Sequence, residues 1–325
     1  MPFLDVAVRR GEFVRARVPI GELMDGSPVA FPVVTVGGAR PGPTLYVQAG
    51  QHGDEATGIE NCRAFLATLD PSKIAGTVVA VPVANVPAHI TRTRGYLNEE
   101  RWLIDMNRVY PGNRHGLLTE RTAAIVIEEF VKHADLTIDL HSGLEGCDIL
   151  PFASVDPPDD QHGTLELRER VATSAGLPYV YYPARGHTTS DMSRAIGAQA
   201  DAAGHAHVSM EMGESRRVSW KLVPNAVRAL HNAMRVLGME EGEPTIDAKP
   251  RALRSVRLVH TERGGGLRLR VDLGDEVREG QTLGEVVDIF GQRVEEIVAP
   301  SAGVVMRAMR LASVSSGAEA VWLGA

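Results

Sequence analysis

Cysteine, surplus positive charge and long hydrophobic runs are all scarce in this sequence of 325 residues. Its only two cysteines, Cys62 and Cys147, argue against a secreted scaffold held together by disulfide bonds. A net charge of −7 leaves no basic surface of the kind that binds nucleic acid or anionic lipid. The most apolar stretch, residues 76–87, is interrupted by prolines and is too short to span a bilayer. Because the first residues also lack the apolar core of a signal peptide, we expect a cytoplasmic enzyme or binding protein with no nucleic-acid or membrane partner.

Lysine is absent after Lys249, in a segment whose composition differs from that of the preceding chain. Residues 250–325 read as short β-type runs separated by turns, with no helical period, which predicts a small all-β domain. The segment resembles the barrel-sandwich modules that carry biotin or lipoate on a lysine side chain. The lack of lysine excludes that role and leaves a structural or oligomerising one, so a homo-oligomer is a possible assembly. We therefore expect the β-domain over residues 250–325 and a separate, larger domain over residues 1–245.

Apolar runs of strand length alternate with helical patterns between residues 44 and 240. Such alternation is typical of a mostly parallel or mixed sheet with helices on both faces, so the expected fold class is α/β. In sheets of this kind, functional sites form where the strands end at their carboxyl edge. The expected strands are 44–50, 76–85, 136–143, 179–183 and 207–213, and the expected helices are 59–69, 119–134, 165–176 and 225–238.

Residues 50–58, GQHGDEATG, follow the first of these strands and bring metal-binding side chains to its carboxyl end. One helical turn places His52 and Glu55 on the same side, so that both can bind one metal ion. His141 ends another strand, in DLHSG, and two His with one carboxylate leave a coordination position open for water, as in hydrolytic zinc sites. Asp139 shares a strand face with His141 and either orients that histidine or is a solvated or capping residue. The alternative for Glu55 is that it only favours the N-terminus of the next helix.

The strand HVSMEMG, residues 207–213, carries a candidate general base. Its period of two places Glu211 near the carboxyl end, where a carboxylate beside a metal-bound water can take up a proton. Glu214 is the competing choice, in the loop that follows the strand. A metal pair made of His205 and His207 is a weaker alternative, because it would leave the other metal-binding candidates unexplained.

Residues 105–112, DMNRVYPG, form a loop that contains Asn107 and Arg108. An arginine with a neighbouring amide suits the two-point recognition of a carboxylate. The alternative is an ordinary surface arginine. Arg185 and His187 lie in a glycine-containing loop that either lines the same pocket or is a plain surface loop.

Together these motifs resemble the succinylglutamate desuccinylase/aspartoacylase family of zinc amidohydrolases, which is related to the zinc carboxypeptidases. The matching pieces GQHGDEATG, NVPAH, DMNRVYPG, DLHSG and MEMGE follow the family's order over residues 45–215, and the C-terminal β-segment is also similar. The resemblance implies a zinc carboxypeptidase-like fold, one zinc ion per chain and a small N-acyl substrate with a carboxylate. The roles that it implies are zinc ligand for His52, Glu55 and His141, general base for Glu211, and carboxylate binding for Asn107 and Arg108.

The family also has an arginine that polarises the scissile carbonyl, and its match in this sequence is imperfect. The segment before DMNR carries an insertion, which leaves Arg92, Arg94 and Arg101 as candidates. Arg94 is favoured because it belongs to the "TR" pair nearest the family's segment.

The sequence therefore predicts a zinc-dependent deacylase that hydrolyses the amide of a small N-acyl amino acid or related N-acyl amine. One alternative is a carboxypeptidase for short peptides, which uses the same metal and base in a longer cleft. A second is a metal-dependent binding protein without catalysis. Because all the expected metal ligands and the base are present, hydrolysis is the favoured interpretation.

Overall fold

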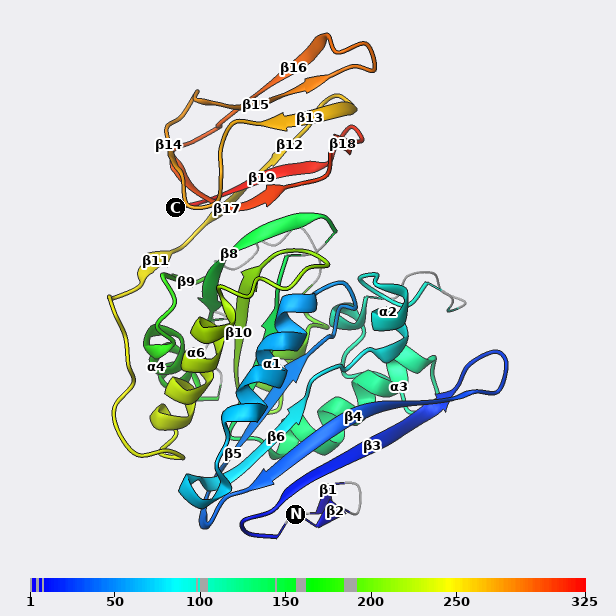
Figure 1. Cartoon of the computed structure of the whole chain (residues 1–325), viewed down its shortest axis with the longest axis vertical. Helices are drawn as coiled ribbons and strands as arrows, with labels where there is room; N and C mark the ends of the chain where they lie inside the picture. The colour runs from blue at the N-terminus through cyan, green and yellow to red at the C-terminus, as the bar shows by residue number, and fades with distance from the viewer. Residues whose placement is uncertain are drawn as a thin grey trace.

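A computed structural model describes residues 2–3, 6–7, 9–97, 99, 105–143, 145–155, 162–183 and 192–325 of the chain. It has a large mixed sheet with helices on both faces, and a group of C-terminal strands that lies against one end of this body (Figure 1). The fold class expected from the sequence is confirmed. No helix within these ranges is long and apolar enough to cross a membrane.

Four parallel strands form the middle of the sheet, and all four coincide with strands expected from the sequence. β5 (Arg40–Ala49) lies between β6 (Ala75–Val81) and β7 (Leu136–His141), and β10 (Ala206–Gly213) pairs with the other side of β7. β6 ends before Pro82, because proline lacks the N–H group that a central strand needs. The register brings the carboxyl ends of β5, β7 and β10 to the same edge of the sheet.

Further strands flank these four. β3 (Phe13–Glu22) and β4 (Pro28–Gly37) extend the sheet beyond β6, and β8 (Cys147–Ser154) pairs antiparallel with β10. β3, β4 and β8 are not among the strands expected from the sequence. β3 alternates charged and apolar residues, as suits an edge strand with one exposed face. The expected strand near residue 180 is present as β9 (Tyr179–Tyr181), which is parallel to β8. A separate two-stranded sheet contains β1 (Pro2–Phe3) and β2 (Val6–Ala7).

Helices cover both faces of the sheet and bury two separate apolar clusters. One face packs against α1 (Ala56–Thr68), α4 (Leu165–Ser174) and α6 (Val223–Val236), and the other against α3 (Leu118–Ile125) and α5 (Ile196–Ala202). The helix expected over residues 119–134 is divided, since a π-helical turn and a 3₁₀ turn follow α3. The short helical elements are η1 (Pro71–Lys73), α2 (Val86–Thr91), η2 (Met106–Arg108), η3 (Val126–Phe130) and η4 (Val131–His133).

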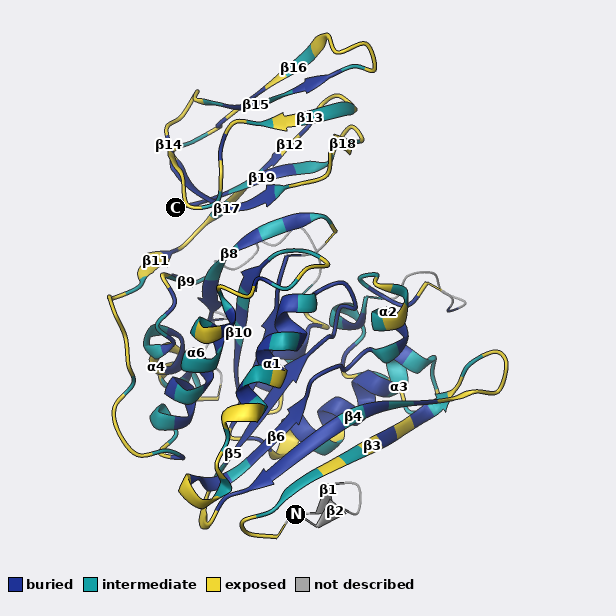
Figure 2. Cartoon of the chain, in the orientation of Figure 1, coloured by how far each residue is buried: buried dark blue, intermediate teal, exposed yellow. Residues whose placement is uncertain are grey.

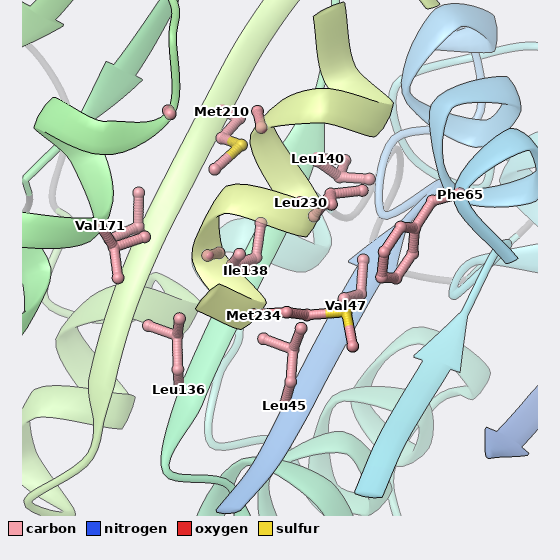
Figure 3. Packing of buried hydrophobic residues seen from close by; sticks show 14 of the residues in the cluster. Leu45, Val47, Phe65, Leu136, Ile138, Leu140, Val171, Met210, Leu230 and Met234 are labelled. Carbon is pink, nitrogen blue, oxygen red and sulfur yellow. The ribbon is translucent and has the colours of Figure 1, made fainter. Parts of the chain in front are cut away.

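The central strands have an apolar face and a partly polar face. On the apolar side, leucine, isoleucine and valine side chains of β5 and β7 pack against Phe65 of α1 and Leu230 and Met234 of α6 (Figure 3). Successive side chains of a strand point to opposite faces, so the intervening residues Gln48, Asp139 and His141 share the other face. β7 is buried along its whole length and β5 from Thr44 onward (Figure 2), so the polar side chains must find partners inside the protein.

Residues 251–325, all of which the structure describes, contain strands and no helix. One group forms a separate four-stranded antiparallel sheet, and another extends the large sheet because β17 pairs with β8. A domain boundary between residues 245 and 250 therefore stays a prediction, since the large sheet runs through both parts. The separate sheet contains β13 (Gly265–Leu269), β15 (Thr282–Val287), β16 (Arg293–Val298) and β18 (Ser313–Val314). The other strands are β11 (Arg251–Leu253), β12 (Val256–His260), β14 (Glu276–Val277), β17 (Gly303–Met309) and β19 (Glu319–Gly324).

Candidate metal centre and its cavity

The loop between β5 and α1 needs glycine at two positions. Gly50 has a φ of +62°, and a Cβ atom on Gly53 would lie 2.0 Å from the carbonyl oxygen of Ala88. These glycines let the loop pack closely against α2, which brings His52 and Glu55 to the carboxyl end of β5. Glu55 occupies the N-cap of α1, but its side chain makes no capping hydrogen bond. Capping therefore does not explain why a glutamate stands at this position.

The side chains of His52, Glu55 and His141 converge in the interior. Nδ1 of His52 is 2.7 Å from Oε1 of Glu55, and Nδ1 of His141 is 2.9 Å from Oε2 of Glu55. One ligand atom from each residue lies within 4.8 Å of the others, and the three side chains are 2%, 1% and 6% exposed. Two imidazole nitrogens and a carboxylate oxygen are suitable ligands for a divalent transition metal. These three residues are therefore able to hold a metal ion.

A carboxylate lies behind each histidine. Oδ1 of Asp105 is 3.0 Å from Nε2 of His52, and Oδ2 of Asp139 is 2.7 Å from Nε2 of His141. An ionised carboxylate can only accept a hydrogen bond, so Nε2 of each ring donates to its aspartate. Nδ1 of each ring faces Glu55, to which it donates while the ring is protonated, and it offers a lone pair to a metal once that proton is lost. Of the two alternatives for Asp139, the contact with His141 is the one present. The contact of Asp105 with His52 has no counterpart in the sequence analysis.

The charges within this cluster compensate one another. Burial opposes ionisation of Glu55, but the imidazoles of His141 and His52 hold its pKa below the usual range. Burial also opposes a positive charge on His141, yet Asp139 and Glu55 hold the pKa of His141 well above its usual value. In the same way His141 keeps the pKa of Asp139 low in spite of burial. A metal ion would therefore have to displace a proton that these carboxylates stabilise on His141.

Glu211 lies beside His141, because the register of β10 and β7 pairs these two residues. Its Oε2 atom is buried and has no hydrogen-bond partner among the described residues. Burial raises the pKa of Glu211 to about 7, a shift that His141 opposes and Glu55 increases. The competing candidate, Glu214, instead forms an ion pair of 3.3 Å with Arg217.

A cavity of about 500 Å³ opens in front of these residues. His207, Ser209 and Glu211 line it from one face of β10, and the N-terminus of α5 forms another wall. The C-terminal strands β12 and β19 also contribute, through residues that include Leu258 and Trp322. The metal-binding cluster therefore faces a space enclosed by both parts of the chain.

Arg94, Asn107 and Arg108 all line this cavity and surround Asp105. Nε and Nη2 of Arg94 are 3.0 and 2.9 Å from Oδ2 of Asp105, while Nη1 is buried without a partner among the described residues. Arg108 donates to the carbonyl oxygen of Asn107 at 2.8 Å and lies 3.9 Å from Asp105. Oδ1 of Asn107 accepts a hydrogen bond of 3.0 Å from the N–H of Ile196, so the side chain offers its amide nitrogen as a donor.

The remaining candidates are not brought to the cavity by the described part of the chain. Arg92 ends α2 in a left-handed conformation and does not line the cavity. His205 contacts the carbonyl oxygen of Ala134 at 3.1 Å, so it does not form a metal pair with His207. Arg101, Arg185 and His187 lie outside the described residues.

Sequence reasoning missed several polar residues that surround the ligands, namely Asp105, Gln48, Gln51 and Tyr110. Asp105 had a usable signal, because it precedes Asn107 by two residues and caps η2 by accepting from its N–H. No local signal marks Gln51 and Tyr110, whose hydrogen bond joins residues 59 positions apart in the chain.

Comparison with known proteins gives consistent matches. Residues 41–237 match the model of the succinylglutamate desuccinylase/aspartoacylase catalytic domain. The N-alpha-acetyl-L-2,4-diaminobutyric acid deacetylase of Halomonas elongata is 30% identical over 263 residues, which cover 79% of this chain and 74% of that protein. Two solved structures share the fold: the ectoine utilization protein EutE (DoeB) from Ruegeria pomeroyi and a succinylglutamate desuccinylase/aspartoacylase from Rhodobacter sphaeroides. Their TM-scores are 0.88 and 0.83, both at 24% identity, and each match covers 98% of this chain and 97% of the other.

We expect metal binding to release protons and to weaken as the pH falls. His141 must be neutral to bind a metal, and its raised pKa keeps it protonated to a higher pH than an ordinary histidine. The apparent affinity should therefore rise with pH until the pKa of His141 is passed, and then level off. Isothermal titration calorimetry of metal-free protein, in buffers of different ionisation enthalpy, counts the released protons. An affinity that stays constant between about pH 6 and about pH 9 would contradict this expectation.

Proposed function

The chain belongs to the succinylglutamate desuccinylase/aspartoacylase family, and from that premise we propose that it hydrolyses the amide bond of a small N-acyl amino acid with one zinc ion per chain. Members of this family are deacylases of N-acyl amino acids. One structural observation is the main support for this proposal. The buried group His52, Glu55 and His141 lies next to the unpaired oxygen of Glu211, inside a cavity of about 500 Å³. That volume lies within the range of about 300–1,000 Å³ typical of small-molecule sites.

Zinc is the metal that we infer for this site. His52, Glu55 and His141 would hold it, and three protein ligands drawn from His and Glu are typical of catalytic zinc. Asp105 and Asp139 support the fit, because each fixes a histidine so that Nδ1 is available for a metal. When bound, zinc lowers the pKa of water and polarises a carbonyl group.

Glu211 is the residue that we assign to proton transfer. It takes a proton from the attacking water and delivers it to the nitrogen of the leaving amine. A pKa near 7 suits both steps at neutral pH, since an efficient acid–base group titrates near the working pH. The absence of a hydrogen-bond partner for Oε2 among the described residues leaves that atom available for the water.

We assign Arg94 to stabilisation of the reacting carbonyl oxygen and Arg108 to binding of the substrate carboxylate. Arg94 is anchored to Asp105 through two nitrogens, and its third, Nη1, is available to stabilise negative charge on the oxygen of the scissile carbonyl. Arg108 and the amide of Asn107 bind the carboxylate of the substrate, with the planar guanidinium facing both of its oxygens. Two free cysteines also agree with a cytoplasmic location, which we include in the proposal.

A substrate panel tests the proposed reaction against the peptidase alternative. Metal-free protein should be inactive, and zinc should restore hydrolysis of N-acetyl and N-succinyl amino acids, because the metal would polarise the scissile carbonyl and lower the pKa of the attacking water. Dipeptides and tripeptides serve as the comparison. Leu258 and Trp322 of the C-terminal region line a cavity of about 500 Å³, a volume that suits a small substrate, so the N-acyl amino acids should have the higher kcat/KM. Preferential cleavage of peptides would contradict the assignment, and so would full activity without metal.

Replacing Glu211 tests the proton-transfer role. Glu211→Gln keeps the shape of the side chain but cannot accept the proton, so kcat should fall by about 10²- to 10⁴-fold. The zinc content, measured by atomic emission, should equal that of the wild-type protein. Glu214→Gln is the matched control and should stay active, because Glu214 pairs with Arg217 instead of facing the cavity. Loss of activity in the Glu214 variant alone would show that the base is assigned to the wrong residue.

Replacing Arg108 tests carboxylate recognition. Lysine in Arg108→Lys retains the charge but loses the two-point contact, so the KM of an N-acyl amino acid should rise while zinc content stays constant. Hydrogen bonds to charged groups contribute about 1.5–3 kcal/mol, which corresponds to a loss of about 10- to 150-fold in kcat/KM. Arg63→Lys, on the exposed side of α1, is the matched control. The assignment of Arg108 to carboxylate binding is wrong if an N-acyl amine without a carboxylate shows the same loss of kcat/KM in Arg108→Lys.

A further inference from the structure

Four buried polar side chains lie on the metal-binding face of the sheet and take no part in the reaction proposed above. Tyr46 and Gln48 belong to β5, Gln51 to the loop that follows it, and Tyr110 to the chain after η2. All four are at most 1% exposed. We call them the tyrosine–glutamine cluster. Buried polar groups are costly unless they are hydrogen-bonded, so their arrangement is informative.

The two tyrosines determine which way the two glutamine amides face. The hydroxyl of Tyr110 donates to Oε1 of Gln51 at 2.7 Å, and the hydroxyl of Tyr46 donates to Oε1 of Gln48 at 2.9 Å. Since each carbonyl oxygen accepts from a phenol, each NH₂ group is turned the other way. These NH₂ groups donate to Asp139, at 3.2 Å from Gln48 and 3.4 Å from Gln51. A flipped amide would place its carbonyl oxygen against the carboxylate, which is electrostatically unfavourable.

Asp139 connects the two ordered glutamine amides to His141, a proposed metal ligand. Its Oδ2 is 2.7 Å from Nε2 of His141, and Nδ1 of the same ring lies beside Glu55. Each phenol hydroxyl thus donates to an amide oxygen, and each amide NH₂ donates to the carboxylate of Asp139. The imidazole of His141 donates to the same carboxylate. We propose that the tyrosine–glutamine cluster is a positioning device that fixes Asp139, and through it His141, for metal binding.

Tyr110 is the central member of the cluster. Besides donating to Gln51, its hydroxyl accepts a hydrogen bond of 3.3 Å from Nε2 of Gln48, so it contacts both glutamines. Tyr46 contacts only Gln48 within the cluster and stacks on Phe130, at 5.4 Å between ring centroids. Removing the Tyr110 hydroxyl should therefore disturb both amides, while the ring keeps its packing.

Tyr110 also belongs to the same loop as Asp105, which contacts Nε2 of the other histidine ligand. The segment from residue 105 to residue 110 therefore reaches both histidines, one directly and one through the cluster. This segment includes Arg108, so the loop proposed to bind the substrate carboxylate also orders the metal site. The inference rests on the proposed zinc site and adds a role for residues that touch neither metal nor substrate.

The test measures zinc affinity of the purified full-length chain by competition with a chelator of known affinity. Removing the partner directly behind a metal-binding histidine usually weakens metal affinity about 10- to 100-fold. Tyr110 lies two hydrogen bonds further out than Asp139, so Tyr110→Phe should bind zinc more weakly than wild type, by about 10-fold or less. Gln51→Met removes the same link and should give a similar loss, which covers the case that the first variant folds poorly. Tyr179→Phe is the matched control, since the Tyr179 hydroxyl has no hydrogen bond in the described part of the chain and does not line the cavity.

A double-mutant cycle separates positioning from general destabilisation. If the cluster acts through Asp139, Tyr110→Phe should change zinc affinity little in an Asp139→Asn background. The visible absorption of cobalt-substituted protein should also differ between wild type and Tyr110→Phe, because the ligand field senses the orientation of His141. Unchanged affinity in Tyr110→Phe would overturn this inference alone, as would an equal loss in both backgrounds. If the wild-type chain fails to bind zinc at all, the proposed function fails together with the inference.

Discussion

The hydrogen-bonded register of β5, β7 and β10 is the constraint on which the rest of the site depends. It places Gln48, Asp139 and Ser209 at one level, and His141 and Glu211 at the next. Because side chains alternate between faces, a slip by one residue would move this whole set to the opposite face, among the apolar side chains beneath α1 and α6. The packing of the apolar face therefore decides the chemistry of the polar face. A ligand and the proposed base meet because leucine, isoleucine and valine elsewhere on the same strands are buried.

A second constraint is the pairing of charges in the interior. Three carboxylates, those of Glu55, Asp105 and Asp139, lie with two histidines and Arg94 in a region with little access to water. Removing one member would leave its partner charged and unpaired, which is strongly unfavourable inside a protein. The geometry of the site is therefore maintained by mutual compensation, and the proposed metal ion would replace a proton within a network that already exists. The tyrosine–glutamine cluster extends this network by neutral hydrogen bonds.

The C-terminal strands contribute to the wall of the cavity. β17 pairs with β8, and β8 pairs with β10, the strand that carries Glu211. A continuous sheet thus links the β-segment to the proposed base. Leu258 and Trp322 from this segment line the cavity together with residues of β10 and α5. The part of the sequence that resembles a biotin or lipoate carrier, but lacks lysine, therefore contributes a wall of the site.

Local patterns along the chain predict the α/β fold class and the candidate site residues His52, Glu55, His141 and Glu211, and the set of motifs in their order indicates the family. A strand followed by glycine and a helix leaves a recognisable pattern, and so does a period of two along a strand. The three-dimensional structure was needed to show which carboxylate stands behind each histidine, how Gln51 meets Tyr110, and that Trp322 reaches the cavity. These contacts join residues that are far apart in the chain, and no local pattern encodes them. They arise from packing in three dimensions, where the register of the strands and the closure of the loops determine which polar groups meet.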